Sequence, residues 1–248
     1  QSNEGLRQIR TGRLKIDVGK ITVKSFAKSM VVCIGLLPAL ASAENFYITS
    51  QAGNQLSVFD SDTTKIKNVV ELSSGPAMSA IDSQNNAIYL SHPEQGKLSV
   101  IDMTTFELIT EIKTGGQPFS MVMDSQKPQM FVTDWSRNAV LVINTNSRQL
   151  VDLLAVGESP AGIAIDTAGR KVFVANRESN SVMVLSADTP DLFATIETGE
   201  RPYAIAFNSH NNQLYVTCVQ DNTLTVIDTN TYQKVASLNP GRAPYGVT

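Results

Sequence analysis

The sequence predicts an all-β fold in which four-stranded sheets repeat along the chain, and three observations support this prediction. A period of 42 residues is marked by prolines at Pro76, Pro118, Pro160, Pro202 and Pro244. Short segments rich in Val, Ile and Thr lie between turn residues, and the repeats contain no amphipathic helix. A repeat of about 40 to 50 residues with strand periodicity is typical of one propeller blade. We therefore expect a β-propeller with five units present.

The chain begins with two segments that differ from the repeats. Residues 23–43 have the parts of a secretory signal peptide: a basic lead, a short apolar run and the small-residue pattern Ala41-Ser42-Ala43. The apolar run over residues 30–40 is shorter than the roughly 20 residues that cross a bilayer. Residues 1–22 are expected to be an upstream extension, with translation starting at Val23; a long leader is the alternative.

This division predicts a propeller over residues 44–248 that is periplasmic or secreted, with no transmembrane segment in the mature chain. Without residues 1–43 the chain keeps 13 Lys and Arg against 21 Asp and Glu, a net charge of −8. An acidic domain repels polyanions, so nucleic acid is an unlikely partner. The mature chain also keeps a single cysteine, Cys218, which excludes an internal disulfide.

One repeat shows how each blade is built. In residues 118–157 four short apolar segments are separated by turn residues, which predicts strands over residues 120–123, 130–133, 140–143 and 150–156. The second and third segments are apolar on both faces, as expected for a sheet covered on each side by its neighbours.

The repeated polar and glycine positions favour turns over metal or phosphate sites. Asp60, Asp102 and Asp228, with Asn144 in the equivalent place, end the third strand where a short acceptor bonds to following amides. Asp60-Ser61-Asp62 resembles the start of a calcium loop, but the later ligands are absent. Glycines three residues before the repeated prolines are expected to supply positive φ at the links between blades; they are Gly115, Gly157, Gly199 and Gly241.

The second-strand segments, such as Tyr47-Ile48-Thr49-Ser50, Phe131-Val132-Thr133-Asp134 and Tyr215-Val216-Thr217-Cys218, resemble the Tyr-Val-Thr-Asn signature of YVTN-repeat (YncE-like) β-propellers. The resemblance covers residues 46–248. It implies the fold strongly and the activity weakly, since such propellers include exported binding proteins, surface-layer proteins and relatives of dehydrogenase subunits.

Members of that family usually have seven blades, which leaves two interpretations of the five units. In the first interpretation the chain forms a five-bladed ring closed by its own tail, because residues 244–248 resemble the inner strand that the first unit lacks. In the second interpretation, which we prefer, the sequence is an incomplete reading frame of a longer, seven-bladed propeller.

The loops after the second strands and the links between blades open on one face, which we call the top face. Because these loops vary while the opposite turns repeat, function is expected there. Ser50, His92, Asp134, Asn176 and Cys218 occupy one equivalent position and are expected to border it. In a catalytic interpretation, His92 and Asp134 would form an acid-base pair and Cys218 would be a nucleophile or a soft metal ligand. The interpretation that we favour is a turn position that accepts any small polar residue.

A binding surface is the stronger prediction, because Trp, Tyr and Arg are the side chains that most often anchor interfaces. A solvated rim with a few packing aromatics is the competing interpretation. The predicted binding residues of the top face are His92, Asp134, Trp135, Arg137, Asn176, Arg177, Glu178, Arg201, Tyr203, Cys218, Arg242 and Tyr245. No catalytic residue, metal site or cofactor is predicted.

The function predicted from these residues is a non-catalytic binding or protein-interaction scaffold. Its partner would be a protein or a small anionic ligand, because Arg201 and Arg242 are expected near the mouth of the channel. The alternatives are a relative or subunit of a periplasmic quinoprotein or haem-type dehydrogenase, or another propeller enzyme, and a cell-surface or adhesion protein.

Overall fold

The computed structural model describes residues 45–73 and 75–248. They form 19 β-strands and one short 3-10 helix, η1 (Pro93–Gln95). The predicted extension over residues 1–22 and the predicted signal peptide over residues 23–43 lie outside the described residues.

The strands form five antiparallel sheets, each made of consecutive strands. The first contains β1 (Asn45–Ser50), β2 (Gln55–Asp60) and β3 (Ile66–Glu71). The second contains β4 (Ser79–Asp82), β5 (Ala87–His92), β6 (Lys97–Asp102) and β7 (Leu108–Lys113). The third contains β8 (Pro118–Met123), β9 (Gln129–Asp134), β10 (Ala139–Asn144) and β11 (Gln149–Ala155). The fourth contains β12 (Pro160–Asp166), β13 (Lys171–Asn176), β14 (Ser181–Ser186) and β15 (Leu192–Glu197). The fifth contains β16 (Pro202–Asn208), β17 (Gln213–Cys218), β18 (Thr223–Asp228) and β19 (Gln233–Leu238).

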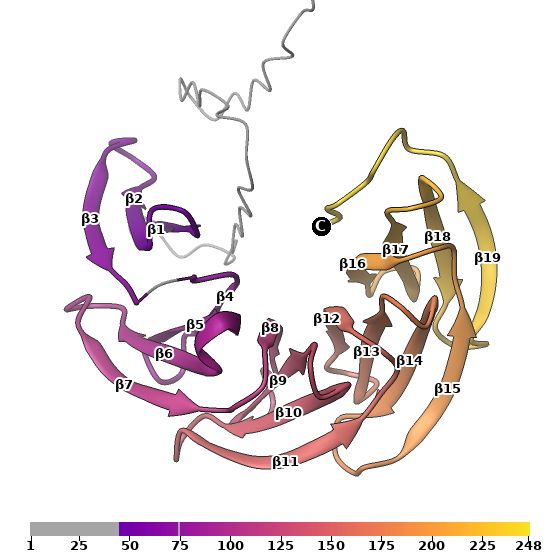
Figure 1. Cartoon of the computed structure of the whole chain (residues 1–248), viewed down its shortest axis with the longest axis horizontal. Coiled ribbons are helices and arrows are strands. Elements are labelled where there is room, and N and C mark those ends of the chain that lie inside the picture. The colour runs from indigo at the N-terminus through magenta and orange to yellow at the C-terminus, as the bar shows by residue number, and fades with distance from the viewer. Residues whose placement is uncertain (1–44, 74) are drawn as a thin grey trace, which may run out of the picture.

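The sheets stand around a common axis as the blades of a propeller and form an open arc (Figure 1). The first strand of each four-stranded sheet lies nearest the axis and the last lies on the perimeter. This arrangement confirms the predicted all-β propeller. In the first sheet β2 is the one described strand that pairs with β1, so this sheet has no strand in the innermost position. Residues 244–248 form no strand, so the tail does not close the ring in this structure.

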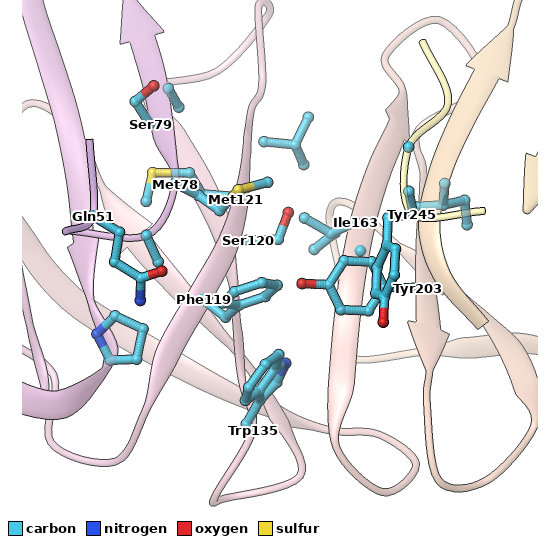
Figure 2. A pocket seen from close by; sticks show the side chains of 18 of the residues that line it. Gln51, Met78, Ser79, Phe119, Ser120, Met121, Trp135, Ile163, Tyr203 and Tyr245 are labelled. Carbon is cyan, nitrogen blue, oxygen red and sulfur yellow. The ribbon is translucent and has the colours of Figure 1, made fainter. Parts of the chain in front are cut away.

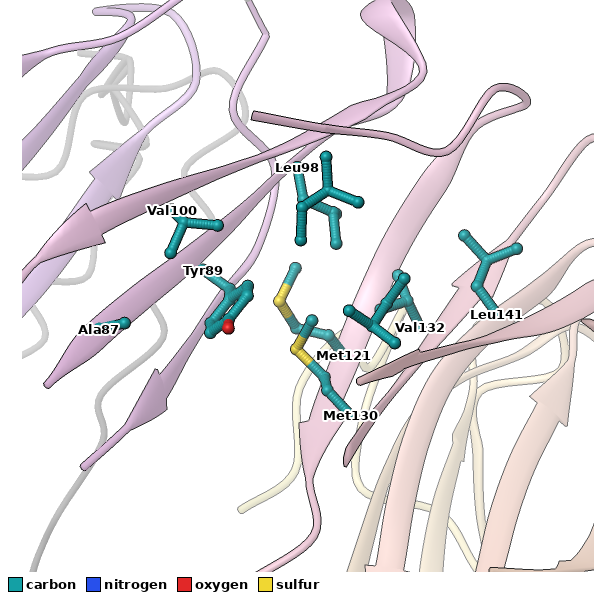
Figure 3. Close-up of a cluster of buried hydrophobic side chains, with 10 residues drawn as sticks. Ala87, Tyr89, Leu98, Val100, Met121, Met130, Val132 and Leu141 are labelled. Carbon is teal, nitrogen blue, oxygen red and sulfur yellow. The ribbon is translucent and has the colours of Figure 1, made fainter. Parts of the chain in front are cut away.

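Neighbouring blades are held together by layers of apolar side chains. Between the second and third blades, Tyr89 and Leu98 face Met121, Met130 and Val132 (Figure 3). Every residue of β5 is buried, as expected for a strand covered on both faces. Truncating a fully buried Leu or Met in such a layer typically costs about 2–5 kcal/mol. These layers therefore fix the position of each blade relative to the next.

A hydroxyl in the second strand ties the inner strands of adjacent blades together. Thr133 Oγ1 accepts a hydrogen bond from the Ser120 N–H at 3.0 Å and donates one to the Ala161 carbonyl of the next blade at 2.9 Å. One blade earlier, Ser91 Oγ accepts from the Met78 N–H and donates to the Phe119 carbonyl. A Thr or Ser at this motif position thus satisfies backbone groups that the bulged inner strand leaves unpaired.

The asparagines of the repeat brace the links between blades. Asn138 has a φ of 53°, in the left-handed region that Asn tolerates better than most residues. Its side-chain oxygen accepts a hydrogen bond from the Ser159 N–H at 3.0 Å, just before the repeated proline. The same bond recurs from Gly75 to Asn54, from Arg201 to Asn180 and from Ala243 to Asn222. Asn54, Asn138, Asn180 and Asn222, which stand 42 or 84 residues apart in the sequence, therefore have the same structural role.

The prediction for the link glycines is correct for Gly115 and Gly241, which have positive φ, and wrong for Gly157 and Gly199. A Cβ on Gly157 would come within 2.7 Å of the Asn176 side chain, so close packing excludes a side chain there. The positive φ moves instead to the residue before the proline, for example Ser159.

The turns on the face opposite the top face contain the predicted capping bonds. Asp60 Oδ1 accepts hydrogen bonds from the N–H groups of Asp62 and Thr63, and Asp228 Oδ1 does so from those of Asn230 and Thr231. The bond from the Thr63 N–H is the largest of several causes that lower the pKa of Asp60. These bonds confirm the turn interpretation of the Asp series.

The opposite face also has an ion network, which we call the Arg170 network, that joins the third and fourth blades. Arg170 bonds to both carboxylate oxygens of Asp124, at 2.9 and 2.6 Å, and to Asp188 at 2.8 Å. Lys127 reaches the same Asp188 at 2.6 Å. Burial opposes ionisation of Asp124, but the bonds from Arg170 and its neighbours outweigh it and lower the pKa. Asp188 also has a lowered pKa, mainly through Arg170.

Candidate functional site

A cavity of about 1320 Å³ lies at the axis of the arc. Its walls come from the inner strands of the blades, and Pro93, Glu94 and Trp135 of the top loops also line it. Trp135 stands at one end of the cavity (Figure 2). Ligand sites commonly have volumes of about 300–1000 Å³, so this cavity is large enough for a small molecule or part of a protein partner.

Four aromatic side chains form a continuous band on the cavity wall, which we call the aromatic band. The Phe119 and Trp135 rings lie 4.2 Å apart between centroids and are tilted by 34°. Tyr203 meets Phe119 edge-on at 6.0 Å, and Tyr245 meets Tyr203 edge-on at 5.4 Å. Such tilted and edge-on pairs are favourable, at about 0.5–1.5 kcal/mol each beyond the area they bury.

The band extends from the third blade to the fifth because the fourth blade has small residues at the equivalent place. Ala161 follows Pro160 where Phe119 follows Pro118, and Gly162 comes next. A Cβ on Gly162 would lie 2.5 Å from the Tyr203 carbonyl oxygen, so only glycine lets β16 approach β12 this closely. The small pair allows Tyr203 to reach Phe119 across an intervening blade.

The rest of the lining is mostly apolar. Met78, Met121 and Met123 contribute flexible thioethers, and Gln51, Ser79 and Ser120 contribute polar groups. Burial raises the pKa of the Tyr47 and Tyr203 phenols, so both are uncharged at neutral pH. Among the described lining residues, Glu94 has the one side chain that is charged at neutral pH, and none is Lys or Arg.

The predicted ring of polar residues lies inside the blades rather than on the rim. The second strands run one residue further than the sequence indicated, so His92, Asp134, Asn176 and Cys218 end β5, β9, β13 and β17 and are fully buried. Ser50, in the first sheet, is partly exposed and bonds to the Gly53 N–H.

These buried side chains have structural partners. His92 lies 2.9 Å from Ser99 Oγ and 3.5 Å from Ser73 Oγ. Asp134 Oδ1 accepts from the N–H groups of Gln117, Ser136 and Arg137 and so fixes its own loop.

The remaining ring residues are also packed within their blades. Asn176 Nδ2 is 3.4 Å from Ser181 Oγ, and the Cys218 thiol lies in an apolar cluster beside Thr225. His92, Asp134 and Cys218 are all fully buried, which keeps the imidazole, the carboxylate and the thiol from solvent. The ring therefore does not present the acid-base pair and nucleophile of the catalytic interpretation to a substrate.

The predicted charged residues lie in the loops of the top face and in the links between blades, and they partly pair with each other. Glu178 bonds to Arg177 at 2.6 Å and lies 3.5 Å from Arg201. Arg137 donates to the Thr114 carbonyl at 2.8 Å, and Arg242 is exposed after β19. None of these four arginines is among the residues that line the cavity in the described chain.

Phe119 is the site residue that sequence reasoning missed. It is 7% exposed and is the central ring of the aromatic band. The available signal was its place directly after a repeated proline, since Tyr203 and Tyr245 occupy the same repeat position. Ala77 and Ala161 at that position hid the aromatic character of the series.

Across residues 45–73 and 75–248, no three His, Cys, Asp or Glu side chains gather in a way that could hold a metal ion. The same residues include no helix with the length and hydropathy needed to span a bilayer.

Two family models match the sequence. Residues 38–164, just over half of the chain, match the family described as Domain of unknown function (DUF5074). The chain belongs to this family. Residues 147–237 match a second model, described as Lactonase, 7-bladed beta-propeller, which supports the β-propeller assignment. No curated protein matches the sequence.

Among solved structures, the chain is similar to hydrazine synthase from Kuenenia stuttgartiensis, with a TM-score of 0.74 and 21% sequence identity. The match covers 82% of this chain and 66% of that one, so the chain spans slightly less than two thirds of the hydrazine synthase chain. At this identity the likeness concerns the fold alone.

Proposed function

We propose that the protein is an exported, YVTN-type propeller that acts as a non-catalytic binding scaffold through its top face. One observation supports this most directly. Trp135 and Tyr203 come from different blades yet lie in one aromatic band on the cavity wall, and Arg177 and Arg201 both approach Glu178 in the neighbouring top loops. Large aromatic and Arg side chains clustered in this way are typical anchors of a binding surface.

The internal bonding of the top face favours binding over catalysis. The groups that would serve as acid, base or nucleophile, namely His92, Asp134 and Cys218, are buried within the blades. A general base must reach the proton that it removes, either directly or through one water. A rigid fold with accessible side chains at its rim is better suited to binding a partner than to catalysing a reaction.

The proposed location, periplasmic or secreted, rests on the signal-like segment over residues 23–43. The net charge of −8 left after its removal disfavours nucleic acid as the partner.

The proposal is tested by crosslinking the protein to its partners in a cell-envelope extract and quantifying the captured species by mass spectrometry. The top-face variant is R177A/R201A, and the matched control is K65A/K127A, which removes the same charge from the opposite face. We expect at least one specifically captured partner to fall about tenfold with the top-face variant, a loss of about 1.4 kcal/mol, and to persist with the control. Identical capture by all three proteins would contradict the proposal.

A further inference from the structure

We infer that the cavity binds an uncharged small molecule with a planar aromatic ring, held against the aromatic band. This inference rests on the proposed function and names the class of ligand for its site. It replaces the anionic ligand that the arginines had suggested from the sequence.

The band supplies the surface that a flat ring needs. Trp135 and Phe119 pair at 4.2 Å, and Tyr203 is edge-on to Phe119, so ring faces and ring edges both occur along the wall. An aromatic ligand can stack on a face or meet an edge, whereas an aliphatic ligand gains the buried area alone. Tyr203 keeps its hydroxyl hydrogen because burial raises its pKa, so it can donate a hydrogen bond to such a ligand.

The charge of the lining disfavours binding of an anion relative to binding of a neutral molecule. An anion inside the cavity would lose its hydration with no described Lys or Arg in the lining to compensate, and it would meet the Glu94 carboxylate. The arginines that suggested an anion lie outside the lining, and Glu178 partly neutralises Arg177 and Arg201.

A cation would find Glu94 and aromatic faces, but it would also approach the positive charge of Arg177. That charge acts on Tyr203, because it opposes the rise of the Tyr203 pKa. A neutral ligand is compatible both with the Glu94 carboxylate in the lining and with the charge of Arg177 outside it.

The methionines allow the cavity to adapt to a ligand of unknown outline. Met78 lies in the link just before β4, and Met121 and Met123 lie in β8 of the next blade. Their unbranched side chains can move to fit a flat molecule. Thioethers also make favourable contacts with aromatic rings, at about 0.3–1.5 kcal/mol each.

Two matched dyes test the inference with the whole chain. N-phenyl-1-naphthylamine is uncharged, and 8-anilinonaphthalene-1-sulfonate has the same ring system with an added sulfonate. We expect the uncharged dye to bind at least about tenfold more tightly, a difference of about 1.4 kcal/mol. Because Trp135 is the single tryptophan of the chain and lines the cavity, binding there should also quench its fluorescence.

Variants locate the dye. Y203A should weaken binding of N-phenyl-1-naphthylamine about tenfold, while Y203F should stay within about twofold of the wild type because the ring remains. F193A is the matched control, since Phe193 is an exposed aromatic residue, 47% accessible, on the perimeter strand β15. F193A should leave the affinity unchanged.

Three results would overturn the inference: tighter binding of the sulfonated dye, no binding of the uncharged dye, or loss of binding in F193A. The first leaves the proposed scaffold function intact and restores an anionic ligand. The scaffold proposal fails separately, in the crosslinking experiment, if the top-face variant R177A/R201A captures the same partners as the wild type.

Discussion

The two faces of the propeller use polar residues differently. On the opposite face, Arg170, Asp124 and Asp188 saturate one another across two blades. On the top face, Asp134 and His92 are turned inward to stabilise their loops, and aromatic and Arg side chains remain at the surface. Charge on the opposite face is therefore used within the fold, whereas the accessible groups of the top face are the ones on which the proposed binding function depends. Three substitutions and one pH titration test this difference between the two faces.

The largest effect is expected from R170A. It leaves the Asp124 carboxylate, which has a fully buried side chain, without its bidentate partner. Removing one member of a buried ion pair typically costs about 3 kcal/mol or more. Urea denaturation should show this loss in the free energy of unfolding, while dye binding in the cavity stays unchanged. R177A is the control on the top face and should cost less than about 1 kcal/mol, because the Arg177–Glu178 pair is partly exposed.

The second change, G116A, breaks the top face from within. Gly116 has a φ of 62°, and a Cβ there would collide with the Asp134 carboxylate that organises the loop. A left-handed alanine costs about 1–2 kcal/mol before the collision is counted, so we expect a loss of about 2 kcal/mol. G246A, where a Cβ would meet nothing within 4 Å, is the control. Equal melting temperatures for both variants would contradict the role assigned to Asp134.

The third test is the pH dependence of stability. Asp124 and Asp188 have lower pKa values in the folded state than their ordinary value of about 3.9. Their contribution is therefore complete above the unfolded-state pKa and is lost as the pH falls through the lower folded-state values. Urea midpoints should decline from about pH 4.5 downward. The decline should be shallower in R170A; an identical slope would exclude the Arg170 network as its source.

The smallest effect is expected from K127A. Lys127 reaches Asp188 at 2.6 Å, but both side chains are substantially exposed. Exposed pairs contribute about 0–1 kcal/mol and are screened by salt. The loss of unfolding free energy should therefore be below about 1 kcal/mol and should shrink in 0.5 M salt; a loss as large as that of R170A would show that Lys127 has a larger role.

The repeat made the blades and their turns predictable. The periodic positions recover β8 to β11 to within about two residues, and Asp60 and Asp228 cap turns as expected. The Arg170 network was not predictable, because Arg170, Asp188 and Lys127 occupy turn positions that have other residues in the neighbouring repeats.

For the site, the sequence indicated Trp135, Tyr203 and Tyr245 but could not place the ring residues. His92 belongs to the strand rather than to the loop because it pairs with Lys97 of the neighbouring strand. This additional pair directs the His92 side chain into the blade instead of toward solvent. Spacing along the chain does not decide it, because a polar residue is acceptable in either position.

The contact between Phe119 and Tyr203 joins alternate repeats over the top of Ala161 and Gly162. Arrays of this kind are usually described by coupling between adjacent modules only. Here the third and fifth modules also interact directly with each other. A bulkier residue at position 162, in the fourth module, would therefore weaken the interaction between the third and the fifth. The residues tolerated at position 162 in the fourth module therefore depend on the modules on both sides of it.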